Sequence, residues 1–385
     1  MARNVLLSSQ FLLIGATNFS LFLVLSAWSF LPLFIVELGG NKTDTGLIMG
    51  SIGIATLGSL PIITPLIDRY GRKVFIVGGA FLAGISNAGF LLFETYSPLM
   101  ICVRLLQGVA FAACFNACST AVVDLVAPEH RAQGIGLFGV SSSLAVAAGP
   151  YLGERVLLAW GFHAYFLLLI AFGLIGFFTG LLVKDPAHKV AREKLSGFFS
   201  TALRDRHLSM MTMAAVFGAG FGAMTTFFPL FAQTQGLRSG MFFVCYGVSL
   251  LVVRVFLGSL ADRIEREKII LGCLTGFGSM LVLTSGLSSS WHTFLLGALF
   301  GSLQGLSYPA MMAQIVDTST ESNRAVVVGL FTGSFGVGIN ASLLLWGYIA
   351  NLKGLGFMYL MSGILMFLAA AVAAQRFLAA RKRSS

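Results

Sequence analysis

The chain has 385 residues, of which 57% are hydrophobic and only 10% are charged, whereas soluble domains usually carry about 25% charged residues. Its net charge of +10 does not indicate nucleic-acid binding, because the Lys and Arg residues occupy short segments between long apolar blocks. The composition predicts an all-α integral membrane protein that has the lipid bilayer as a partner and does not bind nucleic acid.

Apolar blocks of about 20 to 28 residues follow one another along the chain, and each is long enough to cross a bilayer core of about 30 Å as a helix. Blocks of this length favour helices over barrel strands, which need only about 10 residues. The first block exceeds the apolar region of a cleaved signal peptide and predicts a permanent helix. The predicted spans, each bounded to within a few residues, are 9–36, 45–66, 74–93, 98–126, 132–158, 162–183, 208–234, 239–260, 269–288, 292–316, 325–350 and 354–379.

The distribution of basic residues predicts the orientation. If the N-terminus lies inside, nineteen of the 25 Lys and Arg residues fall in cytoplasmic segments and four in outer loops, while Arg104 and Arg254 lie within spans. This excess predicts that both termini are cytoplasmic. The longest polar stretch, 184–207, carries six Lys or Arg residues. It is predicted to be a cytoplasmic linker between an N-terminal half, 1–183, and a C-terminal half, 208–385.

The two halves repeat each other. Segment 66–73 reads LIDRYGRK after the second span, and segment 260–267 reads LADRIERE after the eighth. Asp124 ends span four and Asp317 ends span ten, 193 residues later. Because several markers shift by nearly the same amount, we expect a duplicated six-helix unit.

Motifs for familiar enzyme chemistry are absent from the sequence. It contains no P-loop, no His-Glu-x-x-His and no Gly-x-Ser-x-Gly, and its five histidines occur singly. The five cysteines all lie within predicted spans, where small apolar packing is their ordinary role. We therefore expect neither an enzyme nor a resident metal or cofactor.

Three motifs occupy defined places among the spans. Between spans two and three the chain reads Thr64-x-x-x-Asp68-Arg-x-Gly71-Arg-Lys, and span four holds Arg104 followed by Gln107-Gly. Span five holds Gly136, Ala145, Gly149-Pro150 and Gly153-Glu154. In these motifs the sequence resembles the major facilitator superfamily, and the resemblance covers essentially the whole chain. Thr64, Ala145 and Glu154 stand where the family usually has Gly.

The resemblance implies a fold of twelve transmembrane helices in two pseudo-symmetric six-helix bundles, working as a secondary transporter. The span-five motif is associated in the family with exporters that exchange a solute for protons. Glycines in spans five and eleven, among them Gly136, Gly149 and Gly338, are expected to let helices approach closely.

The resemblance also assigns an inner gate. Asp68 is expected to face the N-terminus of span eleven near Ala325, where free N–H groups and the helix dipole favour an anion. Arg72 is expected to pair with Asp124. The alternative is that these are only solvated charges that set the topology, and their twofold repetition counts against it. The predicted gating residues are Asp68, Arg72, Asp124, Asp262, Arg266 and Asp317.

Arg104 lies about six residues into span four, roughly 9 Å deep, where an unpaired charge is costly. It is expected to face a cavity; the alternative is an Arg held by backbone carbonyls. In the family, spans one, four, seven and ten line this cavity. The lining residues expected are Asn18, Phe22, Trp28, Arg104, Gln107, Phe111, Phe115, Asn116, Phe217, Phe221, Met224, Thr225, Gln304, Tyr308 and Met311. Apolar walls with a few amides suit an amphipathic or hydrophobic solute, although any of the Phe side chains could instead face lipid.

A proton-coupled exporter needs a group that binds and releases a proton as the cavity changes sides, and no acid lies deep in a predicted span. Glu154 lies about four residues from the outer end of span five, at a depth similar to that of Arg104. The hypothesis is that Glu154 carries the proton and Arg104 tunes it. Glu37, at the outer end of span one, is the second candidate, and a solvated Glu154 in an outer loop is the alternative.

The sequence thus predicts a monomeric, proton-coupled exporter of small amphipathic or hydrophobic molecules, working by alternating access in a plasma membrane, such as a bacterial inner membrane. An importer or facilitator of a polar metabolite would share the fold but would need a more polar cavity. A receptor or membrane enzyme would need a signalling domain or a catalytic constellation.

Overall fold

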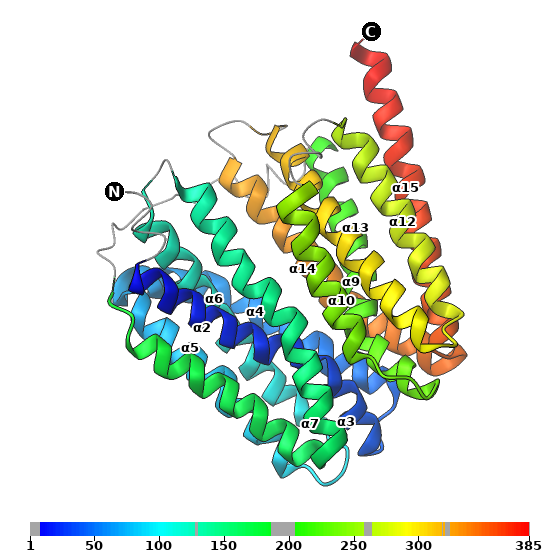
Figure 1. Ribbon diagram of the computed structural model, residues 1–385. Coiled ribbons are helices and arrows are strands. Elements are labelled where there is room, and N and C mark those ends of the chain that lie inside the picture. The colour runs from blue at the N-terminus through cyan, green and yellow to red at the C-terminus, as the bar shows by residue number, and fades with distance from the viewer. Residues whose placement is uncertain are drawn as a thin grey trace. The chain divides into compact units, whose positions relative to one another are not determined.

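The computed structural model describes residues 8–127, 130–185, 205–257, 264–317, 319 and 324–384. Every regular element in these ranges is a helix (Figure 1). Contacts divide the chain into two compact units: residues 1–40 with 51–192, and residues 41–50 with 193–385. Most of the predicted linker 184–207 lies outside the described residues.

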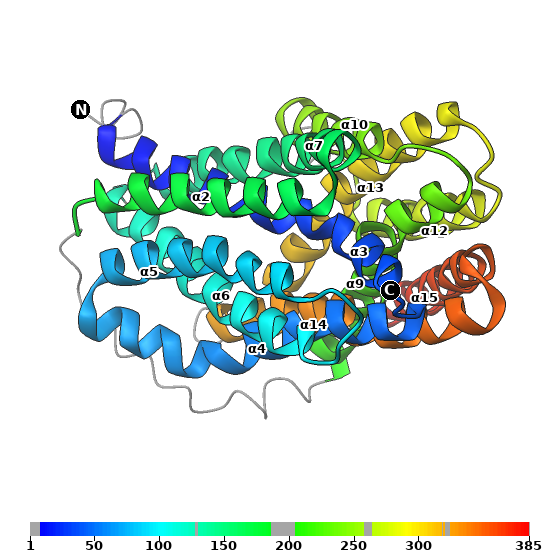
Figure 2. The same cartoon turned by 90° about the horizontal axis from the view of Figure 1, so that it is seen from below.

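The first unit holds the helices of the N-terminal spans, although the first residues of α4, up to Gly50, group with the second unit. Helix α2 lies along α7 (Figures 1 and 2). In chain order the elements are α2 (Ser9–Ala27), η1 (Trp28–Phe30), α3 (Leu31–Glu37), α4 (Lys42–Tyr70), α5 (Arg72–Ile85), η2 (Ser86–Leu92), α6 (Met100–Leu125) and α7 (Arg131–Leu181).

Helix α7 contains two of the predicted spans, and they meet at Gly161. This residue has φ +74° and ψ −174°, which interrupts the helical backbone inside an otherwise continuous run. Glycine adopts positive φ without the steric cost that a Cβ would bring. The predicted boundary between spans five and six is therefore a single glycine kink.

Small residues allow α5 to pack closely against α6 and α7. A Cβ on Gly79 would meet the backbone nitrogen of Cys114 at 2.6 Å, and one on Gly84 would meet Gly173 Cα at 2.7 Å. These contacts bring three helices into one apolar core, in which Ile76, Ala80 and Cys114 are at most 1% exposed. The core fixes the relative positions of the polar residues on α5, α6 and α7.

The second unit holds the helices of the C-terminal spans. Helix α10 continues into η4, a π-helical turn, and the next described residue after this turn is Ile264. In chain order the elements are α9 (Asp205–Thr234), α10 (Gly240–Val252), η4 (Val253–Leu257), α12 (Arg266–Ser285), α13 (Ser290–Asp317), α14 (Arg324–Lys353) and α15 (Leu355–Ser384).

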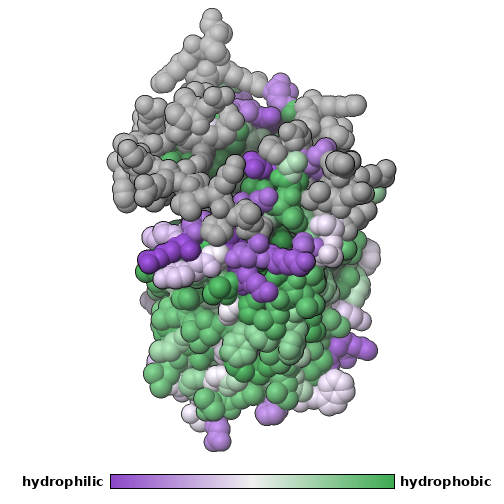
Figure 3. All heavy atoms as spheres, turned by 90° about the vertical axis from the view of Figure 1, so that its left-hand side faces the viewer, coloured by the Kyte–Doolittle hydropathy of each residue, from purple (hydrophilic) through white to green (hydrophobic). Residues whose placement is uncertain are grey.

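The helices fit a membrane protein. In the described residues, nine helical stretches are long and apolar enough to cross a bilayer, and one of them, Gln133–Leu181, covers two predicted spans across Gly161. The two remaining predicted spans correspond to α10 with η4 and to α13. On the face drawn in Figure 3, hydrophobic side chains form a broad surface that is bordered above by a band of hydrophilic ones, and a few more hydrophilic side chains lie at its lower edge. The prediction of twelve spanning helices is confirmed.

Candidate functional site

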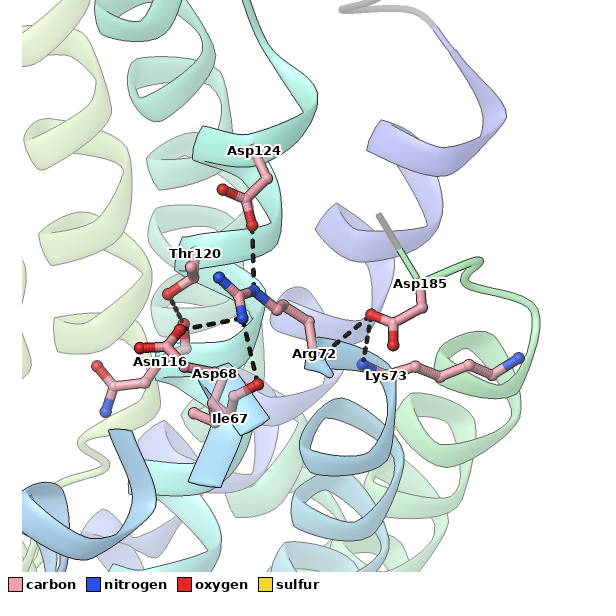
Figure 4. A network of polar contacts seen from close by, with 8 residues as sticks. All are labelled: Ile67, Asp68, Arg72, Lys73, Asn116, Thr120, Asp124 and Asp185. Carbon is pink, nitrogen blue, oxygen red and sulfur yellow. Dashed lines mark hydrogen bonds and ion pairs between the residues drawn. The ribbon is translucent and has the colours of Figure 1, made fainter. Parts of the chain in front are cut away.

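Arg72 is the centre of an ionic cluster in the first unit (Figure 4). Its Nε lies 3.1 Å from Asp124 Oδ2, and its Nη1 lies 3.0 Å from Asp68 Oδ1 and donates to the Ile67 carbonyl at 3.2 Å. The Arg72 side chain is 3% exposed, whereas Asp68 and Asp124 are 31% and 23% exposed. The structure therefore contains the predicted contact between Arg72 and Asp124, and it adds Asp68 to the same guanidinium.

The second unit repeats one part of this cluster. Arg266, at the start of α12, forms an ion pair with Asp317, at the end of α13. This pair is more exposed, with 37% of the Arg266 side chain and 59% of the Asp317 side chain accessible. The predicted partner Asp262 lies outside the described residues.

Arg104 is buried on α6 and is held by neutral side chains. It donates from Nη1 to Gln107 Oε1 at 2.7 Å, and its guanidinium lies 4.8 Å from the centroid of the Trp28 ring. Gln107 and Trp28 both donate to Asn87 Oδ1, at 3.2 and 2.9 Å. In the part of the chain that the structure describes, Arg104 Nε has no hydrogen-bond partner. Arg104 is thus fixed by Gln107 and Trp28 rather than by backbone carbonyls.

Glu154 is buried on α7, where this helix packs against α2. Its side chain is 9% exposed, and a Cβ on the preceding Gly153 would meet Tyr165 and Ala27 within 3.2 to 3.6 Å. One turn earlier, a Cβ on Gly149 would meet the Leu23 carbonyl at 2.8 Å. Glu37 is exposed at the end of α3. Of the two predicted proton carriers, only Glu154 lies inside the helical packing.

The expected close approach of glycines is not general. It holds at Gly149 and Gly153, and at Gly338, where a Cβ would meet the Ala215 backbone. Gly136 and Gly139 have no atom within 4 Å of such a Cβ, and the same is true of Gly329, Gly333 and Gly336. Among the described residues, close packing is therefore found at only some of the glycines for which it was expected.

The expected cavity residues of the first unit include an aromatic group. Phe22, Phe111 and Phe115 are half-buried and contact one another with ring centroids 5.4 to 5.9 Å apart. Asn18 lies one turn before Phe22 and is fully buried, while Asn116 is half-buried and donates to the Ala112 carbonyl.

The expected cavity residues of the second unit fall into two groups. Phe221, Thr225 and Tyr308 are half-buried, and Gln304 accepts a hydrogen bond from Tyr246 at 3.1 Å. The other three are fully buried within this unit: Phe217, Met224 and Met311.

Comparison with known proteins identifies the family. The model of the Major Facilitator Superfamily matches residues 11–249 and 238–385. The chain belongs to the major facilitator superfamily. It is 24% identical to the staphylopine export protein of Staphylococcus aureus over 88% of each chain. It is 25% identical to the multi-drug resistance efflux pump PmrA of Streptococcus pneumoniae over 74% of each. The solved nucleoside transporter NupG shares the fold, with a TM-score of 0.78 and 14% identity over 96% of this chain and 99% of that one.

Membership in the superfamily makes this protein a membrane transporter rather than an enzyme.

The structure also shows a functional candidate that the sequence analysis missed, an acidic residue beside the ionic cluster of Arg72. Asp185 follows α7, and its Oδ1 accepts from the backbone nitrogens of Arg72 at 2.9 Å and Lys73 at 3.4 Å (Figure 4). Free N–H groups at a helix N-terminus favour an anion. Asp185 therefore caps α5 and ties the end of α7 to the Asp68–Arg72 turn.

Replacing Gly71 by Ala is expected to destabilise this turn. Gly71 has φ +90° and ψ 161°, a conformation that costs other residues on the order of 1–3 kcal/mol, and a Cβ there would overlap Asp185 Oδ2. We expect a lower melting temperature in detergent for Gly71→Ala. Gly78→Ala on the same helix is the control, because its Cβ meets open space and Ala is the better helix former. Equal melting of the two variants would contradict this account of the turn.

Proposed function

We propose that this superfamily member is a proton-coupled exporter of small amphipathic or hydrophobic molecules that works by alternating access. The observation that carries the proposal is the match to the staphylopine export protein over 88% of each chain. The similarity to a multi-drug efflux pump supports the same direction of transport. The proposed organisation is two six-helix halves, 1–183 and 208–385, joined by the linker 184–207 in a monomer.

The chemistry of the expected cavity residues supports an amphipathic solute. In the first unit the half-buried Phe22, Phe111 and Phe115 form one aromatic group, and in the second unit Phe221 stacks on Phe300 at 5.3 Å. Polar groups such as Asn116 and Thr225 are few among them. Sites of this kind bind apolar ligands and orient them through a small number of hydrogen bonds.

The importer or facilitator of a polar metabolite remains the alternative. It shares the fold, and the resemblance to NupG at 14% identity concerns the fold alone. Such a protein would present a denser set of polar side chains than the aromatic group of the first unit provides. A receptor or enzyme role has no observation in its favour.

Transport in proteoliposomes tests the proposal. The vesicles receive an imposed pH gradient, and a panel of neutral, cationic and anionic amphipathic dyes is followed by fluorescence. We expect the gradient to drive at least one dye against its concentration gradient, and dissipating the pH gradient with an ionophore should stop this movement. Accumulation of dye that ignores the pH gradient, or movement of polar metabolites alone, would contradict the proposal.

The proposed orientation places both termini in the cytoplasm of a cell whose plasma membrane holds the protein. Single cysteines introduced into 184–207, after the five native cysteines are replaced, should resist an impermeant maleimide in intact cells and react after lysis. A cysteine at the exposed Lys353, in a predicted outer loop, should react in intact cells. This orientation is expected because Lys and Arg are in excess on the proposed cytoplasmic side. Labelling of 184–207 from outside intact cells would show that the orientation is the opposite one.

A further inference from the structure

Asn18 presents a buried hydrogen-bond acceptor that no protein donor satisfies. The residue is fully buried on α2, and its Nδ2 donates to Ser141 Oγ and Ser142 Oγ on α7, both at 2.8 Å. Within the described residues, Asn18 Oδ1 has no hydrogen-bond partner. Buried acceptors of this kind are rare because leaving one unpaired costs free energy, so each needs an explanation.

The hydrogen bonds of Ser141 fix which way the Asn18 amide points. Ser141 Oγ donates its only hydrogen to the Phe138 carbonyl at 2.7 Å, so towards Asn18 it is an acceptor. The structure turns Nδ2 toward the two serines, which gives both amide hydrogens an acceptor, whereas a flipped amide would set Oδ1 against Ser141 Oγ, whose hydrogen is already donated. Oδ1 is therefore the amide atom that does not bond to the two serines.

A partly exposed aromatic group begins one turn after Asn18 on α2. Phe22 follows Asn18 by one turn on α2 and meets Phe111 and Phe115 edge to face, at 5.9 and 5.6 Å. Phe115 also stacks on Phe138 at 6.4 Å, and Phe138 precedes Ser141 by one turn on α7. Phe22, Phe111 and Phe115 remain partly exposed. An aromatic ring could rest on these three while its substituent approached the amide.

The side chains that make up this group offer no carboxylate to a cationic ligand. The side chains that form the group, Phe22, Phe111 and Phe115, are uncharged. The buried charged residue on the same helix, α6, is Arg104, which lies seven residues or about 10 Å before Phe111. The described partners of Arg104, Gln107 and Trp28, are neutral. The carboxylates of Asp68 and Asp124 are already paired with Arg72. A cation would thus find no carboxylate among the residues that form the aromatic group.

We propose that Asn18 Oδ1, with Phe22, Phe111 and Phe115, forms a subsite for a neutral aromatic group that carries one hydrogen-bond donor, such as a phenol. This inference rests on the proposed function, since it specifies the solute that the transporter accepts. The ring packs on the phenylalanines, and the donor satisfies Oδ1.

Three naphthalene compounds with the same substitution position test the subsite: naphthol, methoxynaphthalene and aminomethylnaphthalene, which is cationic at neutral pH. Their affinities for the purified full-length protein are measured by titration calorimetry in detergent. One neutral hydrogen bond predicts that naphthol binds about three- to tenfold more tightly than methoxynaphthalene. The cationic compound should bind no more tightly than naphthol.

Variants assign this preference to one residue. Asn18→Leu should abolish the preference for naphthol and keep the affinity for methoxynaphthalene. Asn340→Leu, which removes an amide from α14 whose Nδ2 donates to the Gly336 carbonyl, should keep the preference. The comparison of compounds on the unmodified protein does not depend on either variant folding.

Equal affinities for naphthol and methoxynaphthalene would overturn the subsite, because they would mean that only water bonds to the Asn18 acceptor. Tighter binding of the cationic compound, no binding of any compound, or a preference for naphthol that survives Asn18→Leu would also overturn it. Transport of the dye panel is measured on the same preparations. Intact gradient-driven transport with equal affinities removes the subsite and keeps the exporter. A preference for naphthol without gradient-driven transport keeps the subsite and removes the proton-coupled exporter.

Discussion

Replacing Asp68 by Asn, or Arg72 by Ala, is expected to impair transport severely while solute affinity stays within a few fold of normal. Arg72 holds Asp68 and Asp124 on one guanidinium with 3% of its side chain exposed, so either substitution removes an ionic contact of a buried charge. The predicted inner gate would then favour one conformation less strongly, whereas the residues proposed to bind solute are unchanged. Transport is measured in proteoliposomes, and affinity by titration with the transported dye.

Arg69→Ala is the matched control for this prediction. Arg69 is adjacent to Asp68 on α4 but is exposed, with its guanidinium 5.2 Å from the centroid of the Tyr70 ring. Its loss should leave transport close to normal. Normal transport by Asp68→Asn would remove Asp68 from the gate. If Asp68→Asn lowered solute affinity and transport together, the substitution would be acting on folding or on the binding site rather than on the gate.

The two copies of the ionic contact are not expected to contribute equally. Arg266 and Asp317 are 37% and 59% exposed, and an exposed pair is typically worth about 0–1 kcal/mol. The pair in the first unit is held by a buried guanidinium that also donates to the Ile67 carbonyl. The two copies of the motif are similar in sequence, but their ion pairs differ in burial. Burial depends on the packing of neighbouring helices, which the motif does not encode.

The membrane-spanning helices could be predicted because each needs its own run of apolar residues, which is a local property of the sequence. The kink at Gly161 was seen only as a gap between two spans, since a single glycine gives no sign that the helix resumes beside it. Core positions were less accessible to prediction. Phe217 and Met224 lie on a span expected to line the cavity, and both are fully buried. Hydropathy alone does not distinguish a side chain that faces the core from one that faces a cavity.

Asp185 shows what the motifs could not reveal. It stands in a polar stretch with several other charged residues, where an acid carries no particular signal. One indication was available at the other end of the contact. Helix α5 begins after a glycine and has Arg72 and Lys73 in its first turn, so it has no side-chain cap of its own. A helix start of this kind needs an acceptor from elsewhere in the chain, but only the fold shows which residue supplies it.

Replacing Glu154 by Gln is expected to abolish the response of transport to a pH gradient while substrate exchange down its own gradient continues. Glu154 is buried at 9% exposure beside Gly153, where the first part of α7 packs against Ala27 of α2 and against Tyr165, which lies on α7 after the kink at Gly161. A carboxyl group at such a position changes its surroundings when these helices move, and its proton affinity depends on those surroundings. Gln keeps the shape and hydrogen-bonding capacity but cannot exchange a proton, so the cavity should still change sides without the coupled ion.

Two measurements on the same proteoliposomes separate coupling from general loss of activity: uptake of dye driven by an imposed pH gradient, and exchange of labelled for unlabelled dye without a gradient. Glu154→Gln should lose the first and keep the second, whereas Glu154→Asp should keep part of both. Glu37→Gln is the control, because Glu37 is exposed at the end of α3 and lies outside the helical packing that surrounds Glu154. Gradient-driven uptake that persists in Glu154→Gln and disappears in Glu37→Gln would move the proton to Glu37. Persistence in both variants would remove these two carboxyl groups from coupling, because neither could then be the group that loads and releases the proton.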